Sequence, residues 1–600
     1  MRRIYNRIKY FEKFRKIIDF SIVLMIAMFC FISLETGNHN TGFLSVKYLY
    51  LNIGTIFFSI IIFSCLFRKL WISAAIHSII LNILAVVNYY VIIYRWVPVS
   101  TADINNIGTT MNVVNGYTFS ITKNIVLIGC CFCISGVFTM LLYQREKANV
   151  EKNIKKTVNN LVAILVCTCV FFYTGYFSEN SVKPVQTLTW SWQESYHQYG
   201  YLASTIEVFC ESLDPVKMPE TYNEKNLTNF SERRKHSSTN TQYSDVILIL
   251  NESYYDLRQI AEITTDVPYM DYFENLENTV KGYAVVPDSG GGTNKSEYEL
   301  LTSNSLQLAP NIVPFNTLDL RKANSIASYM SDLSYSTVGA HSEPALNYSR
   351  GRAYNELEFE NIYFDGDFEN LEYYQAREFE TDKCLYDNLI KMYEKLPSEK
   401  ARFLYLLTIQ NHGGWDMNES ADDFIHVNED FGQYTEQINE FLSCMYLSDL
   451  ALKDLIEYYS NVDRPVVLCI VGDHSPAFAN EIVDNMDDIV TRLKLCSTPF
   501  LIWANYPIEE KNLGYIGMNA LVPNILQAAD MPLSPYYEYI LDTSKQVPVL
   551  TAFDVYVDKA GDIYQYAEKT VYTDLVNQYL NLEYNNIGKH AERIQELFEP

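Results

Sequence analysis

The amino-acid sequence predicts an N-terminal α-helical membrane domain with five spans, followed by an extracellular α/β domain with a mainly parallel sheet. Three observations predict this architecture. Five apolar stretches occupy the first third of the chain, and charged residues lie between them, apart from Asp19 near the start of the first stretch. From Asp245 onward, short apolar runs alternate with helical patterns instead. Basic residues gather near the N-terminus, whereas acidic residues lie mostly from Glu207 onward, so the two parts are expected to lie in different environments.

Length and charge narrow the class of protein further. A chain of 600 residues, 48% of them hydrophobic, is too long for one typical domain and can bury a large core. The formal net charge of -26 argues against a nucleic-acid partner. The 12 cysteines show neither the paired spacing of a disulfide framework nor a zinc pattern.

Each apolar stretch is about as long as the ~20 residues that a membrane helix needs. The alternative is a set of buried helices in a soluble protein, but five such runs with almost all charges between them make that interpretation weak. The five expected spans are approximately residues 17–34, 48–67, 73–94, 124–143 and 158–176.

Basic flanks predict the orientation of these spans. The N-terminus, Arg68-Lys69 and the loop 145–156 are rich in Lys and Arg, and such loops stay on the cytoplasmic side. An odd number of spans then places everything after residue 176 outside the cell. The expected parts are a basic cytoplasmic N-terminus (1–16), a transmembrane domain (17–176), a juxtamembrane segment with a linker at 226–240 (177–241), the extracellular α/β domain (242–545) and a C-terminal subdomain with a helix (546–600).

Continuous Val/Ile/Leu runs in the second part predict strands that are buried on both faces of a sheet. Candidate helices at 438–459 and 518–529 alternate with these runs, as in α/β domains with a parallel sheet. The expected strands are residues 246–250, 283–286, 337–340, 403–409, 466–471 and 499–504.

Polar or ionisable residues follow several of these strands directly. In parallel sheets, ligands bind beyond the carboxyl ends of the strands, so these residues are expected to converge. A single carboxylate at a strand end often only caps the next helix. Four such strand ends are hard to explain as caps. They are expected to place Glu252, Thr293, His412 and the pair Asp473-His474 at the same edge of the sheet.

The stretch from Ser289 to Glu297 is the expected centre of the chemistry. Three glycines lead to Thr293, and a helix-like run follows. Glycines let the backbone approach a ligand closely, and a helix start favours bound anions. A hydroxyl at this point suits attack on a phosphate or sulfate ester, provided that its pKa is lowered. A Gly-rich turn without chemistry is the alternative.

Two further groups complete the candidate site. The carboxylates of Glu252 and Asp473 and the imidazole of His474 suit one divalent ion such as Mn²⁺, Zn²⁺ or Mg²⁺, which would bind the Thr293 oxygen and favour its alkoxide. Arg350, which follows His341 in the chain, can hold a phosphate with its planar fork. His412 is a candidate proton carrier, or alternatively a hydrogen-bonded structural histidine.

Taken in order along the chain, these motifs resemble those of the lipoteichoic acid synthase family, sulfatase-fold members of the alkaline phosphatase superfamily. The resemblance covers nearly the whole chain, including residues 98–104 and a tail helix near 582–589. It implies a threonine nucleophile at Thr293 and one Mn²⁺, with Zn²⁺ or Mg²⁺ as alternatives. The metal ligands would be Glu252, Thr293, Asp473 and His474, and the headgroup pocket would contain His341, Tyr348, Arg350 and His412. Family members often have tryptophan where this chain has Tyr348, and Ser475-Pro476 also diverges, which leaves the headgroup open.

The family implies a membrane enzyme that moves glycerol phosphate from phosphatidylglycerol, or a related lipid donor, to an envelope polymer or glycan. A phosphoethanolamine transferase, or a phosphodiesterase or sulfatase-type hydrolase on the same fold, is one alternative. Sulfatases carry a Cys/Ser-x-Pro-x-Arg nucleophile motif, which this chain lacks. A non-catalytic scaffold or sensor is an alternative of another class, although intact Thr293, Glu252, Asp473 and His474 argue against it. A transporter is disfavoured because the spans contain few charged residues.

Overall fold

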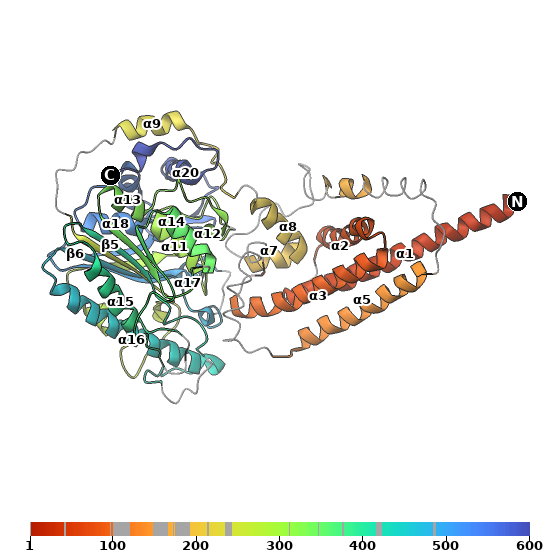
Figure 1. Cartoon of the computed structure of the whole chain (residues 1–600), viewed down its shortest axis with the longest axis horizontal. Coiled ribbons are helices and arrows are strands. Elements are labelled where there is room, and N and C mark those ends of the chain that lie inside the picture. The colour runs from red at the N-terminus through yellow and green to blue at the C-terminus, as the bar shows by residue number, and fades with distance from the viewer. Residues whose placement is uncertain are drawn as a thin grey trace. The chain divides into compact units, whose positions relative to one another are not determined.

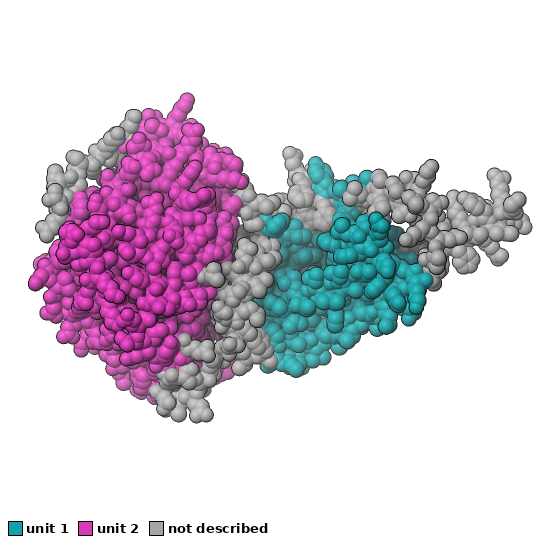
Figure 2. All heavy atoms as spheres, viewed as in Figure 1, with its two compact units in different colours: residues 1–103, 118–213 teal, residues 104–117, 214–600 magenta. Residues whose placement is uncertain are grey.

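The computed structural model describes two compact units, residues 1–103 with 118–213 and residues 104–117 with 214–600 (Figure 2). Described residues are 2–40, 44–95, 98–99, 120–147, 166–171, 173–174, 192–212, 215–233, 243–310, 312–345, 347–374, 377, 379–415, 423–483 and 488–600. The division falls inside the segment predicted to join the two parts.

Within its described residues, the first unit contains four helices that are long and apolar enough to cross a membrane: α1 (Arg2–Gly37, apolar from Ile17), α2 (Val46–Phe67), α3 (Leu70–Arg95) and α5 (Lys123–Lys147) (Figure 1). They match the first four predicted spans. Most of the fifth predicted span lies outside the described residues, although residues 166–171 are helical. The helices bury small and branched side chains such as Ala27, Ile56 and Ala85 between them, while Val137 and Met140 on α5 point outward, as lipid-facing residues do.

Two shorter helices, α7 (Trp192–Tyr199) and α8 (Tyr201–Ser212), pack on the spans. The backbone N–H groups that open α8 are capped from the membrane helices: Tyr201 donates to Oε1 of Glu35, and Ala203 donates to Oδ1 of Asn52, both at 2.9 Å. Tyr196 of α7 is fully buried among these helices.

The second unit is built on an eight-stranded sheet with the order β4-β3-β5-β1-β6-β7-β2-β8. All neighbours are parallel except β7, which runs antiparallel to both β6 and β2. The strands are β1 (Asp245–Asn251), β2 (Thr279–Val285), β3 (Ser336–His341), β4 (Asn361–Tyr363), β5 (Arg402–Leu407), β6 (Val466–Gly472), β7 (Ser497–Ala504) and β8 (Lys511–Gly517). The mainly parallel sheet is therefore confirmed.

Helices cover both faces of this sheet (Figure 1). On β1, Ile247 and Ile249 face a core that includes residues of α15 and α16, whereas α13 packs against β3 and α18 against β6. The helices are α10 (Asp271–Asn275), α11 (Thr293–Thr302), α12 (Pro314–Thr317), α13 (Ile326–Asp332), α14 (Arg350–Glu356), α15 (Asp382–Lys395), α16 (Thr435–Ser460), α17 (Ile489–Leu495), α18 (Leu521–Ala528), α19 (Pro535–Ser544) and α20 (Thr573–Ile587). A small antiparallel sheet of β9 (Val549–Leu550), β10 (Val555–Val557) and β11 (Ile563–Gln565) precedes α20.

The segment 226–240 differs from its prediction as a linker, because helix α9 (Glu224–Arg233) occupies its first part. Only a few of its residues are apolar, but Leu227 is buried and the Phe230 ring lies against Tyr539 of α19. These tertiary contacts stabilise a helix that its mostly polar sequence does not predict.

Candidate active site at the carboxyl edge of the sheet

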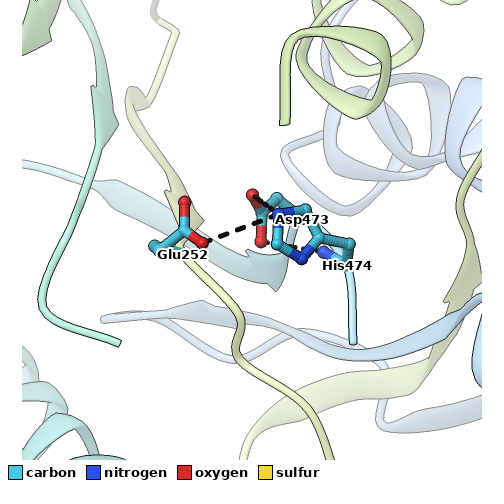
Figure 3. A group of neighbouring side chains, drawn as sticks. All are labelled: Glu252, Asp473 and His474. Carbon is cyan, nitrogen blue, oxygen red and sulfur yellow. Dashed lines mark hydrogen bonds and ion pairs between the residues drawn. The ribbon is translucent and has the colours of Figure 1, made fainter. Parts of the chain in front are cut away.

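Two adjacent parallel strands place the acidic residues of the site side by side. Asn251 at the end of β1 is in register with Gly472 at the end of β6, so Glu252 and Asp473 are the next residue on each strand. Ligand atoms of Glu252, Asp473 and His474 all lie within 4.8 Å of one another (Figure 3). The three residues are 2%, 0% and 6% exposed, so they form a buried cluster of the composition that metal ions prefer.

Backbone groups orient these side chains toward a common point. Oδ1 of Asp473 accepts hydrogen bonds from the N–H groups of Ser253 (2.6 Å) and His474 (2.8 Å), whereas the buried Oδ2 lies 3.1 Å from Nε2 of His474. Nδ1 of His474 lies 2.9 Å from the carbonyl of Ser475, to which it can donate, and this leaves Nε2 to face the carboxylates. Histidines and carboxylates that bind a metal typically form such a hydrogen bond with the atom that does not face the metal.

The electrostatics of the cluster also fit a divalent cation. Burial and the neighbouring Glu252 raise the pKa of Asp473 to about 7. Burial alone lowers the pKa of His474, but the carboxylates of Asp473 and Glu252 outweigh it and leave this pKa raised. Two buried carboxylates without a compensating charge are costly, and a bound cation removes that cost. Oxygen and nitrogen donors together accept Mn²⁺, Zn²⁺ or Mg²⁺.

Thr293 lies directly beside these ligands. It is the first residue of α11, and its Oγ1 is 3.4 Å from Oε2 of Glu252 and 3.3 Å from Nε2 of His474. The hydroxyl of Ser296 donates to the carbonyl of Asp473 at 2.6 Å, which ties α11 to the end of β6. The structure thus brings the Thr293 hydroxyl together with the side chains of Glu252, Asp473 and His474, as the convergence of strand ends predicts.

The glycines before Thr293 have a conformational reason. Gly290 and Gly292 have φ of 73° and 94°, in the region that favours glycine. A Cβ on Gly290 would lie 2.8 Å from Nδ2 of Asn480 and 3.1 Å from Cα of Ala477. The loop therefore needs glycine both for its backbone and for its close packing.

His412 lies in the same neighbourhood, five residues after β5. Burial and the adjacent His474 lower its pKa to about 4, so its ring is neutral near pH 7. Its Nδ1 is buried without a hydrogen bond from the described part of the chain, and its ring packs 4.8 Å from that of Phe379. The buried, neutral ring is compatible with both interpretations of His412, the proton carrier and the structural histidine.

His341 and Arg350 form the neighbouring group. Nδ1 of His341 lies 3.1 Å from the carbonyl of Leu407, and burial together with the Arg350 charge holds the pKa of His341 well below its usual value. The Arg350 guanidinium lies over the Tyr348 ring at 5.1 Å. Tyr348 itself has a left-handed φ of 52°, an uncommon conformation for a bulky residue that is often found at functional sites.

One functional contact was not predicted from the sequence. Nε of Arg350 donates to Oε2 of Glu297 at 2.9 Å, and Tyr354 donates its hydroxyl to Oε1 at 2.5 Å. Glu297 lies on α11 one turn after Thr293 and is fully buried. The i, i+4 spacing of Thr293 and Glu297 places both residues on one side of the predicted helix, and this was the only sign in the sequence that Glu297 lies near the site. Nothing in the sequence pairs this carboxylate with an arginine 53 residues further along the chain.

Comparison with known proteins agrees with this geometry. Residues 244–531 match the model of the sulfatase family, and this stretch contains all eight predicted site residues. The fold and the site thus define a sulfatase-like domain, and the resemblance drawn from the motifs is confirmed at this level.

A solved structure of the phosphoglycerol transferase GacH of Streptococcus pyogenes, in complex with sn-glycerol-1-phosphate, is similar to this chain with a TM-score of 0.54 and 18% identity. The match covers 64% of this chain and 99% of the solved chain. At that identity the match shows a shared fold. The chain therefore combines helices able to span a membrane with a domain whose fold occurs in a phosphoglycerol transferase.

Two curated relatives come from Rhizobium meliloti (strain 1021). One, whose name refers to cyclic beta-1,2-glucan modification, is 25% identical over 307 residues, which is 49% of this chain and 46% of that protein. The other, the capsular polysaccharide biosynthesis protein RkpI, is 31% identical over 111 residues, 18% of this chain and 19% of that protein. The matches cover less than half the length of either relative.

Proposed function

We propose that this protein is a membrane-anchored, metal-dependent transferase that moves glycerol phosphate from phosphatidylglycerol, or a related lipid, to an envelope glycan or polymer outside the cell. The observation that carries the proposal is the position of the Thr293 hydroxyl, within 3.4 Å of Glu252 and 3.3 Å of His474. A hydroxyl at a glycine-rich helix start beside a buried metal-type cluster is the arrangement that an attack on a phosphodiester requires.

Four residues would hold the cation: Glu252, Thr293, Asp473 and His474. When bound, the cation would lower the pKa of the Thr293 hydroxyl and counter the negative charge of the phosphate. In the first step, Oγ1 of Thr293 forms a bond to phosphorus, and the bond from phosphorus to the diacylglycerol oxygen breaks. In the second step, an acceptor hydroxyl attacks the same phosphorus, and the Thr293 hydroxyl is restored.

The remaining residues have supporting roles in this scheme. A neutral His412 can take up the proton that an attacking hydroxyl loses and return it to the departing oxygen. Arg350 is already bonded to Glu297 through Nε, and its terminal nitrogens make no hydrogen bond to described residues, so they can contact phosphate oxygens. His341 and Tyr348 would line the headgroup side of this pocket.

The lipid donor and the glycan acceptor are supported by different observations. Helices that can span a membrane would anchor the chain to a lipid bilayer, which fits a lipid donor. Both curated relatives have names that concern glycans, which supports a glycan acceptor. The basic loops Arg68-Lys69 and 145–156 support an external position for the second unit.

Lipid choice is the direct test. Purified protein with Mn²⁺ is incubated with vesicles of phosphatidylglycerol or of phosphatidylethanolamine, and released diacylglycerol is measured. We expect release from phosphatidylglycerol. Release from phosphatidylethanolamine alone would instead identify a phosphoethanolamine transferase, and release from neither, with metal bound, would favour a non-catalytic scaffold or sensor.

A further inference from the structure

The main chain of His412 is held by a charged residue from a distant part of the sequence. A terminal nitrogen of Arg377, which lies between α14 and α15, donates a hydrogen bond to the carbonyl of His412. The other terminal nitrogen donates to Oε1 of Glu440 at 2.7 Å, and both side chains of this ion pair are only 3% exposed. Arg377 thus connects the His412 backbone to helix α16, which carries Glu440.

The same helix holds the residue before His412. Nδ2 of Asn411 donates to Oγ of Ser448 at 3.0 Å and to Oδ1 of Asn251 at 3.1 Å. Glu440 and Ser448 lie about two turns apart on α16, roughly 12 Å at 1.5 Å per residue. The His412 peptide is therefore fixed at two separate points of one long helix, and through Asn251 it is linked to the residue that precedes Glu252.

The Arg377 segment also contacts the imidazole ring. Phe379 packs 4.8 Å from the ring of His412, and the Arg377 guanidinium lies 5.7 Å from the ring of Phe379. A short stretch of chain thus restrains both the backbone and the side chain of His412.

Stability does not explain why a charged pair occupies this place. Removing two charges from water costs several kcal/mol per ion, roughly, and replacing a buried pair by apolar residues is often neutral or stabilising. An arginine can, however, bond a carboxylate and a carbonyl at once through different nitrogens of one planar group. That geometry suits a residue whose task is to hold another in place.

We propose that Arg377 and Glu440 are positioning residues that set the place of His412 relative to the reacting phosphate. This inference rests on the proposed function, in which His412 handles the proton of an attacking hydroxyl. A displacement of about 1 Å in a catalytic group can lower a rate about 100-fold. Loss of the pair is therefore expected to act through His412 alone.

The test is a double-mutant cycle in the full chain. R377M/E440L removes both charges and keeps apolar bulk, and it is made with and without H412A. We expect kcat for diacylglycerol release to fall about 10- to 100-fold in the wild-type background, and not to fall further in the H412A background. Equal losses in both backgrounds, or no loss in either, would overturn the proposal.

Two controls separate positioning from folding. R464M weakens another ion pair, Arg464 with the buried Asp245, at the opposite end of β1, and it should lower Tm while leaving kcat unchanged. If R377M/E440L does not fold, R377Q/E440Q, which keeps hydrogen-bonding groups without charge, replaces it in the cycle.

A substrate-free measurement distinguishes this inference from the proposed function. In protein with isotope-labelled histidines, the ring signal of His412 is identified by its loss in H412A. We expect this signal to shift in the charge-free double variant and to stay in place in R464M. An unmoved signal would refute the positioning role, whereas a wild-type protein that releases no diacylglycerol would refute the proposed function only.

Discussion

Replacing Arg350 with lysine is a sharp test of the phosphate pocket. In the structure, Nε of Arg350 is bonded to Glu297, and the side chains are 4% and 0% exposed. Lysine keeps the positive charge but has one nitrogen in place of three. Because the buried Glu297 needs a partner, we expect the lysine to stay with it and to give up the phosphate.

The magnitude follows from the number of bonds lost. One charge-assisted hydrogen bond contributes about 1.5–3 kcal/mol, and ~1.4 kcal/mol is tenfold in rate, so kcat/KM should fall about 10- to 150-fold. Tm should change little, since the ion pair with Glu297 is kept. Arg350→Met, by contrast, leaves Glu297 buried and unpaired, which should cost about 3–5 kcal/mol of stability.

The assay compares diacylglycerol release and thermal unfolding for the wild type and both variants. A lysine variant with unchanged kcat/KM would place Arg350 outside the phosphate site. A lysine variant that unfolds at the same temperature as the methionine variant would show that lysine does not keep the ion pair with Glu297.

Three further predictions concern the metal, the membrane and the C-terminal helix. His474→Ala should lose bound Mn²⁺ and activity while keeping its fold, because one of few ligands is gone; full metal content by elemental analysis would refute the site. In a cysteine-depleted background, a membrane-impermeant thiol reagent added to intact cells should label Val571→Cys, whose position is 89% exposed, but not Lys69→Cys. Labelling of Lys69→Cys and not of Val571→Cys would mean that the predicted topology is inverted. Burial raises the pKa of Glu583 on α20 to about 8, above its unfolded value, so its carboxyl destabilises the fold increasingly as pH rises from the unfolded pKa toward 8. Glu583→Gln, which resembles the protonated form, should therefore raise Tm relative to wild type more at pH 8 than at pH 5; an equal shift at both values would contradict this.

Continuous apolar runs made the central strands predictable. Strands β1, β5 and β6 are buried along their whole length, and their hydrophobic sequences predict them nearly to the residue. Strand β8 was missed because it lies at the sheet edge, where Asn512 and Gly514 are exposed or half-exposed and interrupt any pattern. Strand β4, at the other edge, is only three residues long. Edge strands carry little hydrophobic signal because only part of their surface is buried.

The candidate site was predictable where it depends on strand ends. The register of β1 with β6 brings Glu252 next to Asp473, and the rule for parallel sheets was enough to expect this. Side-chain contacts between segments far apart in the sequence were not predictable, as with Glu297 and Arg350 or Glu440 and Arg377. They depend on side-chain directions in the packed structure, which sequence spacing does not contain.

The most direct test of the central claim is mass spectrometry of the peptide that contains Thr293, after incubation with phosphatidylglycerol and Mn²⁺ and without an acceptor. We expect a glycerophosphoryl adduct on Thr293 in the wild type. Thr293→Ala should form no adduct and should release diacylglycerol orders of magnitude more slowly. Diacylglycerol release by Thr293→Ala at a rate near that of the wild type, with no adduct on Thr293 in either protein, would contradict the role of Thr293 as nucleophile.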